Sequence, residues 1–137
     1  MYRTIVVGTN WSDTAEVAFA KALELTRSSG AALHVVTAHD PSPTPVVGGS
    51  APPAAGPDFH ADVALERTLE RLGYQDVDVR QHSSTAEPGE AILEVASRVG
   101  ADLIMVGNKG MHRRVLGSIP NTVSHRAPCD VLIVQTS

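Results

Sequence analysis

Five short apolar runs alternate along this chain with four stretches in which apolar residues recur at helical spacing. Runs rich in Val, Ile and Leu predict buried strands, and the stretches between them predict amphipathic helices. The expected strands are 4–7, 32–38, 77–80, 102–107 and 130–134. Strands that alternate with helices form right-handed βαβ units and a parallel sheet. The sequence therefore predicts an α/β fold, an open five-stranded parallel sheet with helices on both faces.

Capping signals mark the ends of the expected helices. Asp13 followed by Glu16 matches a capping box, in which each side chain satisfies a free backbone N–H group at a helix start. Gly30 and Gly100 stand where the first and third helices should end. Pro88 stands where a proline is tolerated as a first helical residue. These signals support the helical interpretation of the stretches between the strands.

The length of the chain bounds its organisation. It has 137 residues, the usual size of one domain and too few for two separate cores. We therefore expect a single domain over residues 1–137. Residues 40–57 are rich in proline and glycine, which excludes a regular element. We interpret them as a mobile loop inside the domain, either a lid over a ligand or a disordered insertion.

Charge and cysteine content exclude several classes of partner and site. The formal net charge of −4 argues against a general nucleic-acid-binding surface. No apolar run approaches the ~20 residues that span a bilayer, so no membrane partner is expected. Cys129 is the only cysteine, which excludes an internal disulfide and a cysteine-rich metal site. The first residues are typical of a strand rather than a signal peptide, and we expect a cytoplasmic location.

The segment after the fourth expected strand, residues 107–118, combines glycines, basic side chains and a helix start. In open parallel sheets ligands bind beyond the carboxyl ends of the strands, where this segment lies. Glycines let a backbone approach an anion, and Ser118 opens a helix whose N–H groups favour phosphate. The stretch from Ile104 to Cys129 contains no Asp or Glu, but its spacing matches neither a Walker A loop nor a dinucleotide fingerprint. It is either a phosphate-binding loop or a set of tight turns beside a solvated basic segment.

Polar residues also follow the first expected strand, at the same edge of the sheet. Thr9 and Asn10 either reach a ribose or a base, or they only shape the turn before the next helix. His34, on a strand, is expected to be a packed or edge histidine rather than a ligand. The other histidines lie apart in sequence and suggest no metal site.

Three segments in order along the chain resemble the universal stress protein family. They are residues 6–13, residues 102–108, and residues 117–121 leading into 127–134. The resemblance covers nearly the whole chain and implies a Rossmann-like, adenine nucleotide alpha hydrolase-like fold. Many members bind ATP, AMP or cyclic AMP, and most have no established catalytic role. The family commonly forms a homodimer through the last strand, which here contains Val131, Leu132, Ile133 and Val134.

The resemblance also implies where a nucleotide would lie. In members that bind ATP, the glycine loop takes the phosphates and the end of the first strand lies along the adenosine. The backbone at the end of the second strand lies near the base. The residues implicated in this chain are Gly8, Thr9, Asn10, Ala38, Gly107, Asn108, Lys109, Gly110, Arg113, Gly117, Ser118, Ile119 and Pro120.

Two departures from the family pattern bear on the ligand. Only the six residues Met111 to Leu116 separate the second and third glycines of the loop, where the family usually has nine. The family commonly has aspartate at the position of Asn10, so contacts to ribose hydroxyls or a base should be weaker. The short loop leaves a γ-phosphate less enclosed and favours AMP or ADP, although Arg113 and Arg114 partly compensate.

These observations lead to one expectation and two alternatives. We expect a homodimeric regulator of a stress response that binds ATP, ADP, AMP or cyclic AMP, with magnesium as a companion of ATP. The first alternative is a dimeric protein-interaction module of the same fold that binds no nucleotide. The second is a slow ATPase, but the sequence offers no convincing general base and no aspartate pair for magnesium. No catalytic or metal-binding residues are therefore assigned, and the sequence does not indicate the protein partner.

Overall fold

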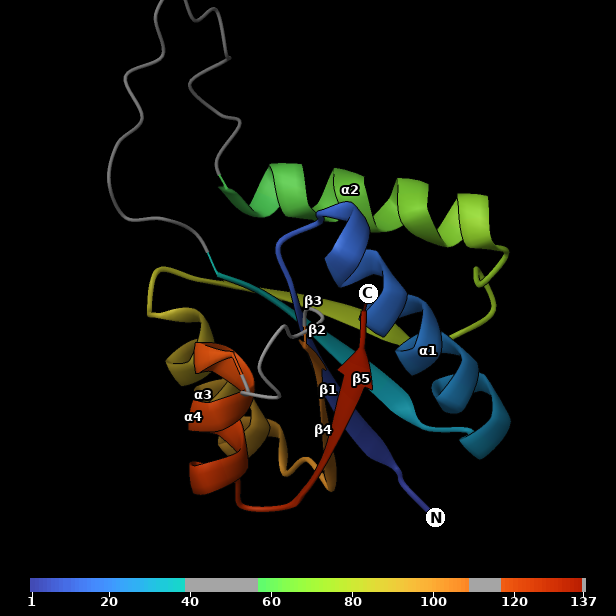
Figure 1. The fold of residues 1–137 in the computed structure, drawn as a ribbon. Coiled ribbons are helices and arrows are strands. Elements are labelled where there is room, and N and C mark those ends of the chain that lie inside the picture. The colour runs from blue at the N-terminus through green and yellow to red at the C-terminus, as the bar shows by residue number, and fades with distance from the viewer. Residues whose placement is uncertain (39–56, 109–116, 137) are drawn as a thin grey trace, which may run out of the picture.

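The computed structural model describes residues 1–38, 57–108 and 117–136 (Figure 1). Five strands and four helices alternate along these residues. The five strands form one parallel sheet in the order β3-β2-β1-β4-β5, which confirms the predicted α/β fold. The elements are β1 (Thr4–Thr9), α1 (Asp13–Ser29), β2 (Ala32–Ala38), α2 (Pro57–Leu72), β3 (Val79–Ser84), α3 (Pro88–Val99), β4 (Leu103–Asn108), α4 (Ser118–Arg126) and β5 (Asp130–Gln135).

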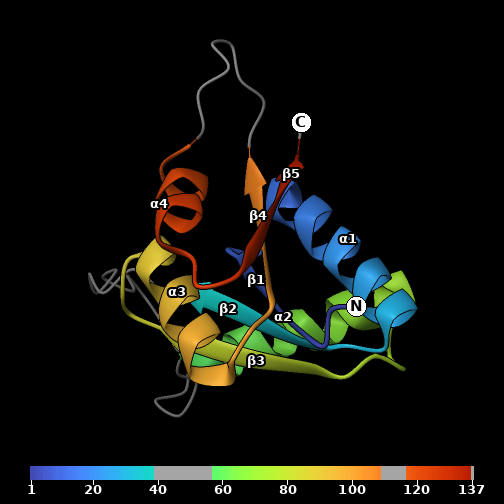
Figure 2. The ribbon, with the colours of Figure 1, turned by 90° about the horizontal axis from the view of Figure 1, so that it is seen from below.

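Two helices cover each face of the sheet. Figure 2 shows α1 and α2 on one side and α3 and α4 on the other. The core between α1 and the sheet is built around Phe19 and Leu23, both fully buried. The core under α3 contains Ile92 and Val95 together with Val6 and Ile104 of the central strands. Burial of the central strands on both faces explains why their sequences are almost continuously apolar.

The third strand differs from its predicted range. β3 begins at Val79 and not at Val77, and it continues to Ser84. The N–H of Val77 donates to the carbonyl of Tyr74 at 3.4 Å, in the turn after α2. This N–H group is therefore not available for a hydrogen bond within the sheet. The continuation to Ser84 is polar because β3 is an edge strand. Apolar runs in the sequence therefore did not indicate this part of the strand.

The predicted capping box at the start of α1 is wrong. Ser12 is the N-cap, with φ −76° and ψ 164°, and its hydroxyl accepts from the N–H of Ala15 at 3.2 Å. Glu16 instead forms an ion pair with Arg71 of α2. The other predicted ends are confirmed, since Gly30 ends α1 at φ 71°. Gly100 likewise ends α3 at φ 67°, and Pro88 is the first residue of that helix.

Most of the proline-rich segment lies outside the described residues. Its last predicted residue, Pro57, is the first residue of α2 and does not belong to a loop. None of the helices in the described ranges is long and apolar enough to cross a membrane.

Candidate functional site

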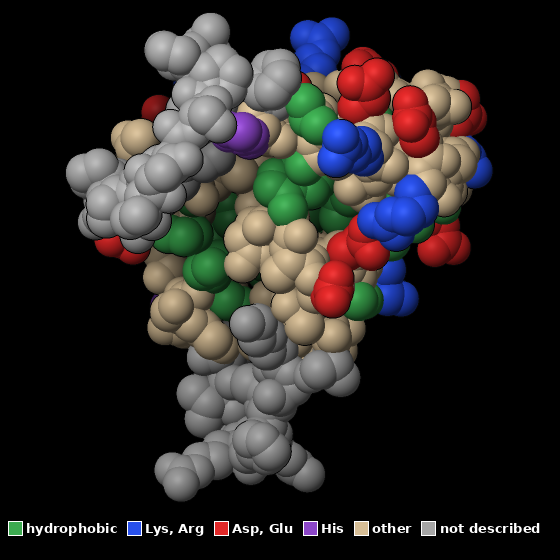
Figure 3. All heavy atoms as spheres, turned by 90° about the horizontal axis from the view of Figure 1, so that it is seen from above, with side chains coloured by type: hydrophobic (Ala, Val, Ile, Leu, Met, Phe, Trp, Pro, Cys, Tyr) green, Lys and Arg blue, Asp and Glu red, His purple; other side chains and the backbone are tan. Residues whose placement is uncertain are grey.

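A pocket opens at the carboxyl edge of the sheet, where β1, β2 and β4 end and α1, α3 and α4 begin. Its volume is about 190 Å³. Figure 3 shows hydrophobic side chains in the middle of this side of the molecule and charged ones over α1 and α2. Six of the thirteen candidate residues line the pocket, which brings together parts of the chain that are far apart in sequence. They are Gly8, Thr9, Asn10, Ala38, Gly107 and Ile119.

Sequence reasoning missed more than half of the lining. Four of the omitted residues lie at the start of α1 and two lie on α3. The residues of α3 were missed because the segment after β3 was not expected at the ligand edge. α3 packs over β1 and β2 rather than over its own preceding strand, so its first turns reach the pocket. The proline at the start of α3 indicated a helix start in the sequence, but it did not indicate that this helix start would line the pocket. The additional lining residues are Ser12, Thr14, Ala15, Ala18, Val36, Pro88, Ile92, Val106 and Thr136.

Two glycines at the ends of the central strands lie where an added side chain would crowd its neighbours. A Cβ atom at Gly8 would lie 2.5 Å from Cδ1 of Ile92, and one at Gly107 would lie 2.9 Å from Cγ2 of Thr136. Both distances are below normal van der Waals contact. A side chain at Gly8 would therefore push Ile92, which itself lines the pocket, out of its position.

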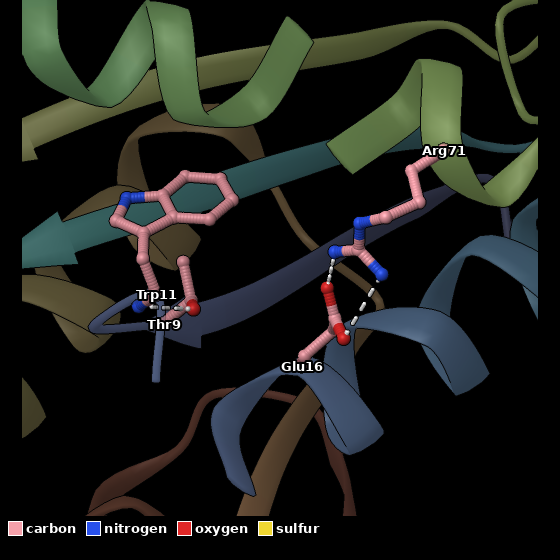
Figure 4. Close-up of polar contacts among 4 residues, drawn as sticks. All are labelled: Thr9, Trp11, Glu16 and Arg71. Carbon is pink, nitrogen blue, oxygen red and sulfur yellow. Dashed lines mark hydrogen bonds and ion pairs between the residues drawn. The ribbon is translucent and has the colours of Figure 1, made fainter. Parts of the chain in front are cut away.

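The loop between β1 and α1 is held by its own side chains. The hydroxyl of Thr9 accepts from the N–H of Trp11 at 2.9 Å (Figure 4), and Oδ1 of Asn10 accepts from the N–H of Ser12 at 3.0 Å. The loop is thus preorganised as successive Ser/Thr and Asx turns. Asn10 has a turn-shaping role, and its amide NH₂ group is left as a donor beside the pocket. Contact of Thr9 or Asn10 with a ligand stays a prediction.

Trp11 anchors this loop from the face of the sheet that α1 and α2 cover. Its φ of 63° is the only positive φ of a non-glycine residue in the part of the chain that the structure describes. The indole Nε1 donates to the Thr37 hydroxyl at 3.1 Å, and the ring meets that of Phe19 edge-on at 5.7 Å. A left-handed backbone persists at such a residue only where the surroundings fix it. Trp11 therefore couples the pocket loop to the α1 side of the core.

Asn108 organises the opposite end of the site, where β4 leads toward α4. Its side chain is almost completely buried, with 2% exposed, and its Oδ1 accepts from the N–H of Gly117 at 3.2 Å. The backbone N–H and hydroxyl of Thr136 both donate to the Asn108 carbonyl at 3.1 Å. Asn108 thereby holds the N-cap residue of α4, Gly117, in an extended conformation at φ −62° and ψ 168°.

The amide nitrogen of Asn108 has no hydrogen-bond partner among the described residues. A buried donor without a partner is destabilising by about 1–3 kcal/mol. An anionic oxygen placed beside the start of α4 would satisfy it, and would also meet the positive end of the helix dipole. The residues present therefore fit a phosphate group at this end of the site.

The remaining candidate residues have different outcomes. Ser118 is an exposed first residue of α4, and Pro120 is buried in its first turn, but neither lines the pocket. Lys109, Gly110 and Arg113 lie outside the described residues. In the described ranges, no three His, Cys, Asp or Glu side chains gather in a way that could hold a metal ion.

His34 is packed, as expected, with 8% of its surface exposed. Its Nδ1 lies 2.8 Å from Nε2 of His82 on the neighbouring strand. Nothing in the sequence indicates that these two histidines are in contact, because 48 positions separate them.

Comparison with known proteins gives concordant matches over almost the whole chain. Residues 1–135 match the model of the universal stress protein family. A universal stress protein of Mycobacterium tuberculosis is 32% identical, over 99% of this chain and 98% of its own length. Similar solved structures include a universal stress protein in complex with cAMP, with a TM-score of 0.75, 32% identity and coverage of 99% and 98% of the two chains. Another is the universal stress protein from Archaeoglobus fulgidus in complex with dAMP, with a TM-score of 0.64, 25% identity and coverage of 97% and 98%.

Proposed function

Because this chain belongs to the universal stress protein family, we propose that it is a regulatory protein of a stress response that binds an adenine nucleotide. The observation that carries the proposal is the buried, unpartnered amide of Asn108 beside the start of α4. Asn108 does not line the pocket itself, but it follows Gly107, which does, and Ile119 of α4 lines the pocket as well. The complexes of similar proteins with cAMP and dAMP support an adenine nucleotide as the ligand class.

The chemistry of the pocket suggests an orientation for the ligand. Val36, Ile92 and Ile119 offer apolar contact to a purine ring, and Thr9 and Asn10 offer polar groups to a ribose. The phosphate would then lie toward Asn108 and the start of α4. The volume of about 190 Å³ is below the roughly 300–1,000 Å³ of typical small-molecule pockets. The similar proteins are described in complex with cAMP and dAMP, which carry a single phosphate, so we take AMP or cyclic AMP as the expected ligand.

The described lining supports binding rather than catalysis. It contains no Asp, Glu, His, Lys or Cys, so it supplies neither a general base nor a carboxylate for magnesium. A slow ATPase would need these groups from elsewhere in the chain. The alternative function is a protein-interaction module that binds no nucleotide. In that case the buried amide of Asn108 would lack the anionic partner that we propose for it.

The proposal is tested by identifying small molecules that leave the purified protein when it is denatured. Mass spectrometry of this fraction is expected to show an adenine nucleotide in stoichiometric amount from the wild-type chain. A fraction with no adenine nucleotide, together with no binding of added AMP, would favour the interaction module.

Asn10→Asp is expected to tighten adenosine binding by about tenfold. The carboxylate keeps an acceptor for the Ser12 N–H and adds a charged acceptor for the ribose hydroxyls, and hydrogen bonds to charged groups are stronger by about 1 kcal/mol or more. Adenosine is the probe because it carries no phosphate that the new charge would repel. The fluorescence of Trp11, the only tryptophan, can follow the titration. An affinity within about twofold of wild type would limit Asn10 to its turn-shaping role.

We also propose a homodimer through β5, which is one of the two edge strands of the sheet. An edge strand presents unpaired N–H and C=O groups that a second copy can satisfy. Leu132, in the middle of β5, is 44% exposed, whereas Val131 and Ile133 pack against the core under α3 and α4. Leu132 is therefore the residue of β5 that can be changed without opening the core.

Leu132→Asp is expected to convert the dimer to a monomer, because two like charges would face each other near the two-fold axis in place of an apolar contact. Sedimentation velocity at micromolar concentration measures the change. The control is Val17→Asp, at an apolar residue of α1 with a similar exposure of 39%, which should leave the dimer intact. A monomeric wild type would contradict the dimer, and a dimeric Leu132→Asp variant would place the interface elsewhere.

A further inference from the structure

A cluster of basic side chains lies on β2, β3 and α3, on the face of the sheet that carries α3. His34 of β2 and His82 of β3 form the 2.8 Å contact, and Nη2 of Arg98 on α3 lies 3.3 Å from Nδ1 of His82. Arg80 is the register partner of His34 and shares this face with His82, two residues further along β3. None of these side chains lines the proposed nucleotide pocket.

The hydrogen bonds fix the proton positions on both rings. A guanidinium group only donates, so Nδ1 of His82 must accept from Arg98 and carries no proton. The proton of a neutral His82 is then on Nε2, which donates to Nδ1 of His34. His34 in turn must carry its proton on Nε2. This chain of contacts is satisfied only while both imidazoles are neutral.

The charges around the two rings favour the neutral form. Burial first, and then the neighbouring arginines, lower the pKa of His82, and burial and the His82 ring lower the pKa of His34. Asp78 acts in the opposite direction on His34, but it also lies 3.6 Å from Arg80. Arg98 has no ion pair with any described residue, even though Glu94 lies one turn before it on α3. The cluster thus gathers positive groups without enough carboxylates to balance them.

The cluster is also accessible. β3 is an edge strand, and α2 packs against its other face. Arg80 and Arg98 are exposed, His82 is half-buried and His34 is buried behind it. Three positive or protonatable groups therefore reach the surface around one buried imidazole. Guanidinium and protonated imidazole groups form strong, charge-assisted hydrogen bonds to oxyanions.

We propose that Arg80, His82 and Arg98 form a second ligand site, which binds a small oxyanion such as phosphate or sulfate. An oxyanion between the two guanidinium groups would replace the contact between Arg98 and His82. Protonation of His82 then turns its Nδ1 into a donor toward the anion, so the anion and the proton bind cooperatively. His34 continues to accept from Nε2 of His82 and orients that ring. The site does not depend on the proposed nucleotide pocket.

The sign of the pH dependence follows from the neutral rings. Without an anion, the pKa of each ring in the fold lies below its unfolded value of about 6.5. The neutral pair contributes its full stability when the pH is above the unfolded pKa. This stability is lost as the pH falls from the unfolded pKa to the lower pKa of the folded state. A bound oxyanion raises the folded pKa of His82, so it should stabilise the protein more in mild acid than at neutral pH.

Sulfate is the appropriate probe, because it remains a dianion across this pH range while phosphate titrates. Imidazole NMR signals of His34 and His82 are followed during sulfate addition, with chloride at matched ionic strength as the reference. Both signals are expected to move with one dissociation constant, which should tighten about tenfold from about pH 7.5 to about pH 5.5. The melting temperature should rise with sulfate at the lower pH and change little at the higher one.

Arg98→Gln, at an exposed residue, should weaken sulfate binding by about tenfold at the lower pH, because a charged donor is lost. Arg67→Gln is the matched control, since Arg67 is an exposed arginine of α2 on the other side of the sheet. Saturating AMP should leave the response of His34 and His82 unchanged, so this test is independent of nucleotide binding. The site would be overturned if neither signal moved with sulfate beyond the chloride reference, or if Arg98→Gln and wild type bound sulfate equally.

Discussion

Asn108→Asp is expected to weaken AMP binding by at least about a hundredfold while leaving adenosine binding within about threefold of wild type. The new carboxylate keeps an oxygen that accepts from the Gly117 N–H, so the start of α4 stays in place. Its second oxygen replaces the buried amide donor that we assign to the phosphate. Two charges about 4 Å apart at an effective dielectric constant of about 20 repel by about 4 kcal/mol, more than a hundredfold requires.

Calorimetric titration of the variant with AMP and with adenosine measures this difference directly. It is best done at about pH 8, because burial raises the pKa of a carboxyl group and the acid must be ionised. Gln75→Glu, at an exposed residue in the turn after α2, makes the same change in net charge far from the site and should bind both ligands normally. Equal losses for AMP and adenosine would indicate damage to the fold. An unchanged AMP affinity would place the phosphate elsewhere.

Gly8→Ala is expected to weaken adenosine binding by at least about tenfold and to lower the free energy of unfolding by about 1–3 kcal/mol. The added methyl group would lie 2.5 Å from Cδ1 of Ile92. The flexible end of Ile92 can move away only by leaving its place on the pocket wall. Both effects therefore have one cause, the displacement of Ile92.

Ile92→Val tests that cause, because valine lacks the Cδ1 atom that the methyl group would meet. Alone it should be destabilising by about 0.5–1.5 kcal/mol, as expected for loss of a buried methyl group. In the Gly8→Ala background it should restore part of the adenosine affinity, and the two changes should be clearly non-additive. Strictly additive losses in both affinity and stability would show that Gly8 acts through something other than Ile92.

The sequence was a good guide where local patterns decide the structure. The apolar runs of β1, β2, β4 and β5 lie in buried or half-buried strands, and their alternation with helices predicted one parallel sheet, although not the order of its strands. It was a poor guide at β3, whose polar residues lie on an edge strand and whose expected start, Val77, is used by a turn. Hydrophobic periodicity carries no information about such a strand.

The candidate site was predictable only in part, for a related reason. Gly8, Thr9 and Gly107 could be identified as pocket residues from their positions at the ends of predicted strands, because every strand of a parallel sheet ends at the same edge. It could not identify Ile92, since the placement of α3 over β1 and β2 is a matter of packing between helix and sheet. The pairing of His34 with His82 depends in the same way on which strands become neighbours. Residues brought together by tertiary packing leave no local signal in a single sequence.

The most direct test of the central claim is calorimetric titration of the wild-type chain with AMP. We expect saturable binding of one AMP per chain, displacement of AMP by cyclic AMP, and loss of this binding in Asn108→Asp but not in Gln75→Glu. No saturable heat with AMP, ADP, ATP or cyclic AMP at concentrations up to about 1 mM, where even weak binding near −4 kcal/mol is detected, would contradict it.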